Sequence, residues 1–420
     1  MLFVSTRNTK NNKKTLSYAI QTGLADDGGL FIPETFPHFN PSDFPETLTY
    51  PLLCQRILEP FFAKDPLENK LPQLCQEAFN FKIPLKPLSS STYLLELFHG
   101  PTLSFKDFGA RFLANCLSTL TEQNTTIIVA TSGDTGSAVA AAFHNKPKTN
   151  VIILFPNNKI SSRQQQQITC WGDNIQCFAV NGSFDDCQRM VKASFKNRAL
   201  TNVLCTANSI NIGRLLPQVA YYAHASLALF RKHGVKTNFV VPSGNFGNVT
   251  AAFWAKKMGF PILAIRIATN ANHALQDFLK TGTFTPHKSI QTLANAMDVG
   301  NPSNFERLQN LFPDYTQFKN AIKNLCVSNA QIEQAIQSVF AKYKTIICPH
   351  TATAYWMREQ RNEEGIWAIV STAHPCKFET IIEPIIHQNV PVDSNLLSML
   401  QKKSTFTQIK PNIGSLRPYL

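Results

Sequence analysis

Charged residues are scarce in this 420-residue chain, and long apolar runs are absent. Only 16% of the residues are charged and 44% are hydrophobic, a balance typical of a folded protein with ample core material. No uncharged apolar run approaches the ~18 residues that a membrane helix requires. The first seven residues, Met1 to Arg7, contain no apolar signal core. We therefore expect a cytoplasmic protein that has no membrane partner.

Patterns typical of metal sites and of disulfide frameworks are also missing. The ten cysteines have uneven spacings, form no CxxC pair and lie in no close Cys/His cluster. Cys170 and Cys177 are too isolated to indicate a zinc site. The sequence therefore predicts reduced, mostly buried thiols and no metal.

An excess of positive charge is present, but it is scattered along the chain. Forty Lys and Arg against 27 Asp and Glu give a formal charge of +13. Basic residues come close together only at Lys10 to Lys14, Lys256–Lys257 and Lys402–Lys403, without interleaved aromatic residues. Attraction of a small anionic substrate is sufficient to explain the charge, so no nucleic acid is expected. A basic RNA-binding protein stays open as a distant alternative.

The length and the changes of pattern predict several domains. A chain of 420 residues exceeds what a single core usually allows. Residues 1–85, which are rich in proline, predict a small helical N-terminal unit. Residues 86–376 alternate strand and helix signals and predict an α/β region, with a largely helical insertion at about 271–342. Residues 377–420 predict a helix and a tail.

Alternating strand and helix patterns indicate the fold class. Apolar runs predict strands at 125–130, 151–155, 175–180, 237–241, 262–267, 344–348 and 367–370. Helical patterns cover 52–59, 70–79, 137–143, 161–171, 184–198, a long stretch after 211, and 249–258. Such alternation predicts an α/β fold of open, mostly parallel sheets with flanking helices.

Lys106 is the strongest candidate for a catalytic side chain. Ser104 is a good N-cap and Asp107 would complete a pair like a capping box, so Lys106 falls in the first turn of a helix. The positive end of the helix dipole and the apolar neighbours Phe105 and Phe108 disfavour an ammonium ion there. A neutral lysine amine can attack a carbonyl and form a Schiff base. The alternative is a surface lysine whose stem covers the aromatic rings.

Two polar loops each follow a predicted strand and precede a helix, where open α/β sheets bind ligands. The loop 243–248, SGNFGN, has two glycines that let backbone N–H groups converge on a phosphate. It matches neither GxGxxG nor a Walker loop. The loop 131–136, TSGDTG, offers hydroxyl and backbone donors without a cation, which suits a carboxylate. Either loop could instead be an ordinary turn that binds nothing.

The chain resembles the threonine synthase family over nearly its whole length. The motifs that carry the resemblance are GGLF at 28–31, HGPT at 99–102, SFKDFG at 104–109, ATSGDTG at 130–136, ANSIN at 207–211, PSGNFG at 242–247, NAMDV at 295–299 and TAHP at 372–375. They occur in the family's order. The resemblance implies the pyridoxal phosphate fold of type II and the cofactor pyridoxal 5′-phosphate.

Site residues follow from the resemblance. It implies that Lys106 holds the cofactor as a Schiff base and that Thr372 faces the pyridine nitrogen. The cofactor phosphate would lie on Gly244, Asn245, Phe246, Gly247 and Asn248. Many members carry an acidic residue where this chain has Asn248. For the substrate, the carboxylate would lie on Ser132, Gly133 and Thr135, and the polar groups available for the phosphate are Lys159, Arg163, Asn208, Asn211 and Arg214.

The implied reaction converts O-phospho-L-homoserine and water to L-threonine and phosphate, the last step of threonine biosynthesis. Lys106 would remove the α-proton and return protons along the carbon chain, phosphate would leave from the γ carbon, and water would add at the β carbon. The nearest alternative is a dehydratase or phospho-lyase of the same fold that releases 2-oxobutyrate. A binding protein that keeps the fold without catalysis is more distant. The expected assembly is a monomer or a homodimer.

Overall fold

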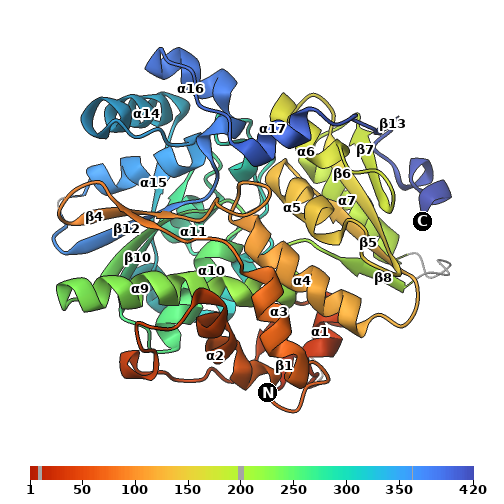
Figure 1. Cartoon of the computed structure of the whole chain (residues 1–420), viewed down its shortest axis with the longest axis horizontal. Coiled ribbons are helices and arrows are strands. Elements are labelled where there is room, and N and C mark those ends of the chain that lie inside the picture. Colours follow the sequence, from red (N-terminus) through yellow and green to blue (C-terminus); the bar gives the residue numbers. More distant parts are fainter. Residues whose placement is uncertain (8–11, 197–202, 362) are drawn as a thin grey trace.

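The N-terminal unit packs under the rest of the chain in Figure 1 and is held together by three helices and a small sheet. The computed structural model describes residues 1–7, 12–196, 203–361 and 363–420. In this unit, β1 (Phe3–Ser5) pairs antiparallel with β2 (Phe31–Pro33), and the helices are α1 (Leu16–Thr22), α2 (Tyr50–Phe62) and α3 (Leu71–Ala78). The two helices predicted at 52–59 and 70–79 are confirmed.

A six-stranded sheet forms one lobe, to the left in Figure 1. Its order is β11 (Lys323–Cys326), β10 (Ile262–Thr269), β9 (Thr237–Pro242), β12 (Ile366–Ser371), β4 (Thr92–Glu96) and β3 (Leu85–Pro87). All pairs are parallel except that of β3 with β4. The helices packed against this sheet are α9 (Val219–His233), α10 (Gly247–Lys257) and α15 (Pro349–Glu359), with α14 (Asn329–Tyr343) outside α15.

A five-stranded, wholly parallel sheet forms the other lobe. Its order is β13 (Thr407–Ile409), β7 (Ile175–Val180), β6 (Thr149–Pro156), β5 (Thr125–Ala130) and β8 (Val203–Thr206). Its flanking helices are α5 (Asp134–Phe143), α6 (Ser162–Thr169) and α7 (Phe184–Lys196), and α4 (Lys106–Leu120) packs on α5. The predicted end of α7 at residue 198 lies outside the described residues. Open, mostly parallel sheets with flanking helices are thus confirmed.

One apolar core connects the N-terminal unit with both lobes. Phe108 of α4 is fully buried in it, and its ring lies 4.7–6.4 Å from the rings of Tyr50, Phe79, Phe81 and Tyr221. Separate clusters fill the opposite face of each sheet, under α14 and α15 in one lobe and under α7 in the other. The buried aromatic residues of α4, Phe108 and Phe112, therefore tie the two lobes to the N-terminal unit.

Helix α8 (Ile212–Leu215) lies between β8 and α9. The remaining helices lie in the insertion and near the C-terminus: α11 (Ala274–Thr281), α12 (Phe305–Leu311), α13 (Tyr315–Ala321), α16 (Glu379–Ile386) and α17 (Ser394–Leu400). The long helix predicted after 211 is interrupted by a short 3-10 turn, Leu216–Gln218, which contains Pro217 and separates α8 from α9. The C-terminal segment is more than a helix and a tail, because β13 adds to the edge of the smaller sheet next to β7.

The strand predicted at 344–348 is wrong. These residues connect two helices: Lys344, with φ of 51°, ends α14, and Cys348 is the N-cap of α15. Thr345, Ile347 and Cys348 are buried, so the apolar run reflects burial between helices and not a place in a sheet. Conversely, the short strands β8 and β11 were not predicted.

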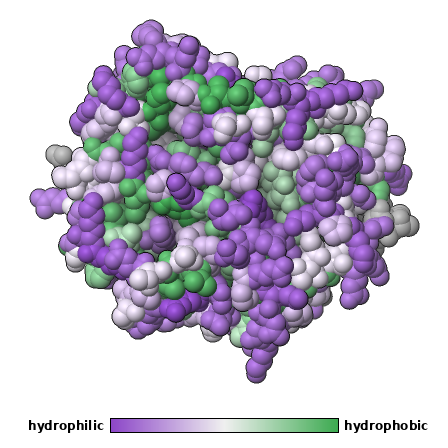
Figure 2. Space-filling view, viewed as in Figure 1, coloured by the Kyte–Doolittle hydropathy of each residue, from purple (hydrophilic) through white to green (hydrophobic). Residues whose placement is uncertain are grey.

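Hydrophilic side chains cover most of the face shown in Figure 2 and break its apolar surface into patches. Within the described ranges, the helices are all too short or too polar to cross a bilayer. The ten cysteines are free thiols, and nine of them are buried, as predicted.

Candidate active site

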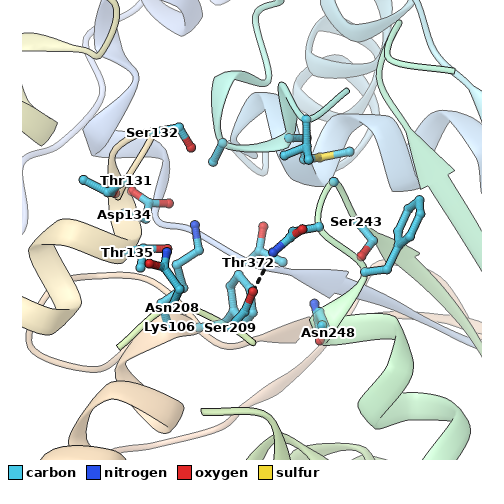
Figure 3. A pocket seen from close by; sticks show the side chains of 18 of the residues that line it. Lys106, Thr131, Ser132, Asp134, Thr135, Asn208, Ser209, Ser243, Asn248 and Thr372 are labelled. Atoms are coloured by element: carbon cyan, nitrogen blue, oxygen red, sulfur yellow. Dashed lines mark hydrogen bonds between the residues drawn. The ribbon is translucent and has the colours of Figure 1, made fainter. Parts of the chain in front are cut away.

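A cavity opens between the two lobes at the carboxyl ends of their parallel strands (Figure 3). Strand β5 leads into Thr131 to Thr135, β9 leads into Ser243 to Asn248, and β12 leads into Thr372. Asn208 and Ser209 follow β8 and also line the cavity. Side chains from both sheets therefore meet at one place, as expected for ligand sites in open α/β folds.

Lys106 is held in this cavity by a short pairing between two segments far apart in sequence. Ser104 forms an antiparallel bridge with Ala373, and the Phe105 N–H donates to the carbonyl of Thr372 at 2.8 Å. Helix α4 then begins at Lys106 itself, so its side chain projects between the 131–135 loop and Thr372 (Figure 3). The pairing places the Lys106 amine beside the end of β12.

The predicted cap of this helix is wrong. The N-cap of α4 is Phe105, which makes no side-chain cap bond, and the Ser104 hydroxyl is buried without a partner among the described residues. The Asp107 carboxylate bonds outside the helix instead, where it accepts from the N–H and the hydroxyl of Thr102 at 2.9 and 2.5 Å. Asp107 thus fastens the start of α4 to the preceding loop.

The pKa of Lys106 is lowered to about 8, mainly by burial and in addition by the nearby cations Arg214 and Lys377. Asp134 acts in the opposite direction and favours the ammonium form. A lysine with such a pKa has a substantial fraction of neutral amine near neutral pH. Burial therefore favours the neutral amine of Lys106, as the sequence predicts. The charges of Arg214 and Lys377 also favour it, and the sequence did not indicate them.

Asp134 and Lys377 form a buried ion pair beside the cavity. Nζ of Lys377 lies 2.7 Å from Oδ1 of Asp134, with the side chains 0% and 3% exposed. Burial alone would raise the pKa of Asp134, but Lys377 and Lys106 together hold it well below its usual range. Gln164 donates to the same carboxylate oxygen at 2.8 Å. A fixed negative charge therefore faces the Lys106 amine.

His350 lies on the cavity wall as a neutral imidazole. Burial lowers its pKa to about 4, and its Nε2 accepts the N–H of Ala296 at 3.1 Å. The proton then resides on Nδ1, which is buried and has no hydrogen-bond partner in the described part of the chain. His350 fixes the wall segment that contains Ala296 and Met297.

The loop at 244–248 has the shape of a cradle at the start of α10. A Cβ on Gly244 would lie 2.6 Å from Cα of Met297, so only glycine fits there. A Cβ on Gly247 would be in ordinary contact with the side chains of Asn304 and Ser209, at 3.4 and 3.5 Å, and Gly247 lines the cavity. Asn245 fixes the loop, because it donates to Ser209 at 2.6 Å, the bond dashed in Figure 3, and accepts from the N–H of Ser303.

The side-chain amide of Asn248 uses its oxygen in hydrogen bonds, whereas its nitrogen has no partner among the described residues. Its Oδ1 accepts hydroxyl protons from Tyr221 and Tyr222 at 2.5 and 2.7 Å. Its Nδ2 is buried and has no partner in the described residues. A buried donor without a partner costs free energy unless a ligand satisfies it. Asn248 therefore marks a place for an acceptor at the start of α10.

The loop at 131–136 uses some of its donors internally. Oγ1 of Thr131 accepts the N–H groups of Gly133 and Gly136 at 3.0 and 2.8 Å, and Gly133 does not line the cavity. Ser132 and Thr135 do line it. Of the three residues predicted to hold a carboxylate, the structure brings these two to the cavity.

The five residues considered for a second phosphate separate into two groups. Arg214 and Asn208 line the cavity. Lys159 is exposed in a turn, Arg163 pairs with Glu379 at 3.0 Å, and Asn211 caps α8 in the core. Lys159, Arg163 and Asn211 are not brought to the cavity.

Arg214 is a buried cation that contacts no carboxylate of the described residues. Its Nη1 donates to the carbonyl of Ala207, and its Nε has no partner among the described residues. Burial lowers its pKa to about 10, so it stays charged at neutral pH. Asn208 is instead engaged with the backbone of Ala130, which it both accepts from and donates to. Arg214 is therefore the better of the two for binding an anion.

Several residues of the site were not predicted. Ser209, Asp134 and Met297 lie within three of the motifs that carry the family resemblance, at 207–211, 130–136 and 295–299. Their place in these motifs was the signal available in the sequence. His350 and Lys377 lie outside the predicted set, and no local pattern marks them. Their place at the cavity results from long-range packing alone.

Comparisons with known proteins agree with this geometry. Residues 82–368 match the family model described as "Pyridoxal-phosphate dependent enzyme", and residues 2–79 match "Threonine synthase N terminus". The chain is 38% identical to the threonine synthase of Haemophilus influenzae, over 97% of this chain and 96% of that protein. It is 37% identical to that of Buchnera aphidicola subsp. Acyrthosiphon pisum, over 98% of each.

Solved structures of threonine synthases are also similar to this chain over its whole length. The crystal structure of threonine synthase from Escherichia coli superposes with a TM-score of 0.94 at 34% identity, covering 100% of this chain and 99% of that one. A threonine synthase from Brucella melitensis with bound pyridoxal phosphate has a TM-score of 0.89 at 31% identity, covering 100% and 98%. The chain belongs to the threonine synthase family of pyridoxal-phosphate-dependent enzymes.

Proposed function

We propose that the chain converts O-phospho-L-homoserine and water to L-threonine and phosphate, with pyridoxal 5′-phosphate held in this cavity. The observation that carries the proposal is the position of Lys106, whose amine projects into a cavity walled by the 244–248 loop and Thr372 (Figure 3). We also propose a cytoplasmic location, which suits ten free thiols.

The residues around the cavity fit this cofactor. Lys106 offers an amine to the aldehyde carbon. Backbone N–H groups at the start of α10, an 11-residue helix, and the free Nδ2 of Asn248 offer donors to the phosphate. Gly247 lines the cavity and has no side chain of its own between its backbone N–H and a phosphate oxygen. When bound, the cofactor supplies an electron sink that stabilises negative charge on the substrate carbons.

Lys106 has two tasks in this proposal. Its neutral amine would hold the cofactor at the aldehyde carbon until the substrate is bound. The freed amine removes the α-proton of the substrate and returns protons along the carbon chain. A pKa of about 8 suits both tasks, because the amine can hold or release a proton near neutral pH. Asp134, whose charge favours the ammonium form, stabilises the protonated stage.

Thr372 is proposed to contact the cofactor ring. It follows directly after β12 and lines the cavity, while its carbonyl is occupied by the Phe105 N–H. The backbone bond keeps the residue in place, and the hydroxyl is directed at the cavity in Figure 3. A hydroxyl can donate to the pyridine nitrogen without forcing it to carry a charge.

Ser132 and Thr135 are proposed to bind the substrate carboxylate. Both lie at the start of α5, where the helix dipole favours an anion, and both carry hydroxyl donors. Gly133 keeps a structural role, since its N–H already bonds to Thr131.

Arg214 is proposed to bind the phosphate of the substrate. It is buried and charged and has a free Nε, and a dianion would supply the acceptor that the described residues do not. Charge-assisted hydrogen bonds of this kind are strong in a site that excludes water.

Product analysis tests the proposed function. The holoenzyme is incubated with O-phospho-L-homoserine, and threonine, phosphate and 2-oxobutyrate are quantified by chromatography. Equal amounts of threonine and phosphate are expected, and Lys106→Ala should form neither. Release of phosphate with 2-oxobutyrate in place of threonine would show a phospho-lyase or dehydratase, the alternative reaction on the same fold.

A further inference from the structure

Away from the active site, His273, Asp277 and His287 bring three metal-ligating side chains together beside α11. Nδ1 of His273 lies 2.6 Å from Oδ2 of Asp277, and Nε2 of His287 lies 3.1 Å from the same oxygen. The ligand atoms all lie within 4.8 Å of one another. The side chains are 42%, 34% and 36% exposed, so an ion can reach them from solution.

The backbone holds the first two residues of the cluster in place. The N–H of Asp277 donates to the carbonyl of His273 at 3.0 Å, so the pair is separated by one helical turn. The adjacent Asn272 bonds to both backbone groups of Ile290, accepting its N–H at 2.8 Å and donating to its carbonyl at 2.9 Å. The segment that carries His287 is therefore clamped against the start of α11.

His287 is also fixed directly. Its N–H donates to the carbonyl of Gly300 at 3.0 Å. A Cβ at Gly300 would lie 1.9 Å from the carbonyl oxygen of His287, so no side chain is tolerated at that contact. The stacked rings of Phe284 and Phe305, 3.9 Å apart, anchor the same segment. Little chain entropy remains to be lost when an ion binds these groups.

Two imidazole nitrogens and one carboxylate oxygen form a ligand set that suits Zn²⁺, with water in a fourth position. Ligands at Zn–N and Zn–O distances of about 2.0–2.2 Å lie roughly 3.3–3.6 Å apart around a tetrahedral ion. The two histidine nitrogens lie 2.6 and 3.1 Å from Oδ2 of Asp277 and within 4.8 Å of each other, so rotations of these partly exposed side chains can bring the three ligand atoms to this spacing. The ion would replace the protons that now bridge the histidines and Asp277.

We propose that His273, Asp277 and His287 bind a zinc ion that fastens the segment 282–300 to α11. The segment reaches the active site, because Ala296, Met297 and Val299 line that cavity and Val299 precedes Gly300. Zinc at this place stiffens one wall of the active site from outside it. The site does not depend on the identity of the substrate.

Cobalt substitution tests the proposal. Co²⁺ is added to the holoenzyme, followed by Zn²⁺, and visible absorption is recorded as a difference against the same holoenzyme without metal. One equivalent of Co²⁺ should produce the bands of a tetrahedral site, and Zn²⁺ should remove them. Asp277→Asn and His287→Ala should each weaken binding by at least tenfold. His144→Ala is the matched control, since His144 pairs with Asp173 at 3.0 Å without a third ligand and should leave binding unchanged.

Amide hydrogen exchange provides the second measurement. Zinc should slow exchange in peptides from 282–300 of the parent and of His144→Ala, and it should not do so in Asp277→Asn. Equal metal binding in the parent and in Asp277→Asn and His287→Ala would overturn the site and leave the cluster as hydrogen bonds alone. Binding without protection of 282–300 would overturn the fastening role.

Discussion

Tyr222 donates its hydroxyl proton to Oδ1 of Asn248 at 2.7 Å, and this bond helps to orient the Asn248 amide. Tyr221 donates to the same oxygen, so the oxygen side of the amide is occupied twice. The Nδ2 side has no partner among the described residues and lies at the start of α10. In the proposed complex this N–H donates to the cofactor phosphate.

Asn248→Asp is expected to weaken cofactor binding. The carboxylate still accepts from both tyrosines, but it removes the donor and adds a negative charge next to the phosphate. Loss of a hydrogen bond to a charged group costs about 1.5–3 kcal/mol, so the dissociation constant should rise at least tenfold. Equilibrium dialysis of the apoprotein with pyridoxal phosphate measures this dissociation constant.

Tyr222→Phe is the control, because Tyr221 still orients the amide, and its affinity for the cofactor should match that of the parent. Unchanged affinity in Asn248→Asp would place the amide away from the phosphate.

Lys106→Ala is expected to abolish covalent attachment of the cofactor and turnover while the fold persists. Lys106 is the first residue of α4, and the packing of that helix rests on Phe108 and Phe112, which are fully buried. Borohydride treatment followed by mass spectrometry should find the cofactor on the parent chain and not on the variant. Lys159→Ala, at an exposed position outside the cavity, should behave like the parent. A reducible bond in Lys106→Ala would move the role to another lysine.

The pH dependence of cofactor attachment should reflect the pKa of Lys106. Because only the neutral amine attacks, the rate of attachment to the apoprotein should rise with pH to a midpoint of about 8, below the ordinary 10.5. The same shift affects stability. Between about pH 8 and 10.5 the unfolded chain holds this proton and the folded chain does not, so the group makes stability rise with pH there.

Stopped-flow absorption at a series of pH values checks the rate, and denaturant melts check the stability. Lys106→Met, which cannot titrate, should lack the contribution to stability in this window. A midpoint near 10.5 would show that neither burial nor the charges of Arg214 and Lys377 act on the amine.

Local patterns predicted most of the strands that build the site. The apolar runs that became β5, β6, β7, β9, β10 and β12 lie within central or near-central positions of the sheets, where burial on both faces leaves few polar residues. The edge strands β8, β11 and β13 are only three or four residues long, which is too short for a clear pattern. The segment 344–348 has the run but is buried between helices, which periodicity cannot distinguish from a strand.

Contacts between residues far apart in the chain could not be predicted from the sequence. Both Arg163 and Arg214 were candidates for binding phosphate. Only the fold shows that Arg163 pairs with Glu379, whereas Nε of Arg214 has no partner among the residues that the structure describes. Likewise, no local pattern indicates that Lys377 pairs with Asp134. Which cations remain available for a ligand depends on partners that packing brings from distant parts of the chain.

Thr372→Val should weaken cofactor binding by about 1 kcal/mol, the typical net value of one hydrogen bond. The change keeps the shape and the backbone bond to Phe105, so the melting temperature of the apoprotein should change little. Thr372→Asp should instead favour a protonated ring nitrogen and add a long-wavelength absorption band with substrate. If both variants bind cofactor and turn over substrate like the parent, Thr372 makes no contact with the ring.

Arg214→Gln should selectively reduce the use of phosphorylated substrate. A dianion on a buried arginine gains about 1.5–3 kcal/mol per charge-assisted hydrogen bond, so loss of two such bonds should lower kcat/KM at least a hundredfold. Competitive inhibition by inorganic phosphate should weaken in parallel, which a merely structural role would not produce. Arg163→Gln is the matched control: it removes an arginine that pairs with Glu379 outside the cavity and should retain phosphate inhibition.

Because Nη1 of Arg214 also donates to the carbonyl of Ala207, Arg214→Lys separates the effect of the charge from that of packing. Partial recovery of phosphate inhibition in Arg214→Lys is expected, whereas inhibition equal to the parent in Arg214→Gln would place the substrate phosphate elsewhere.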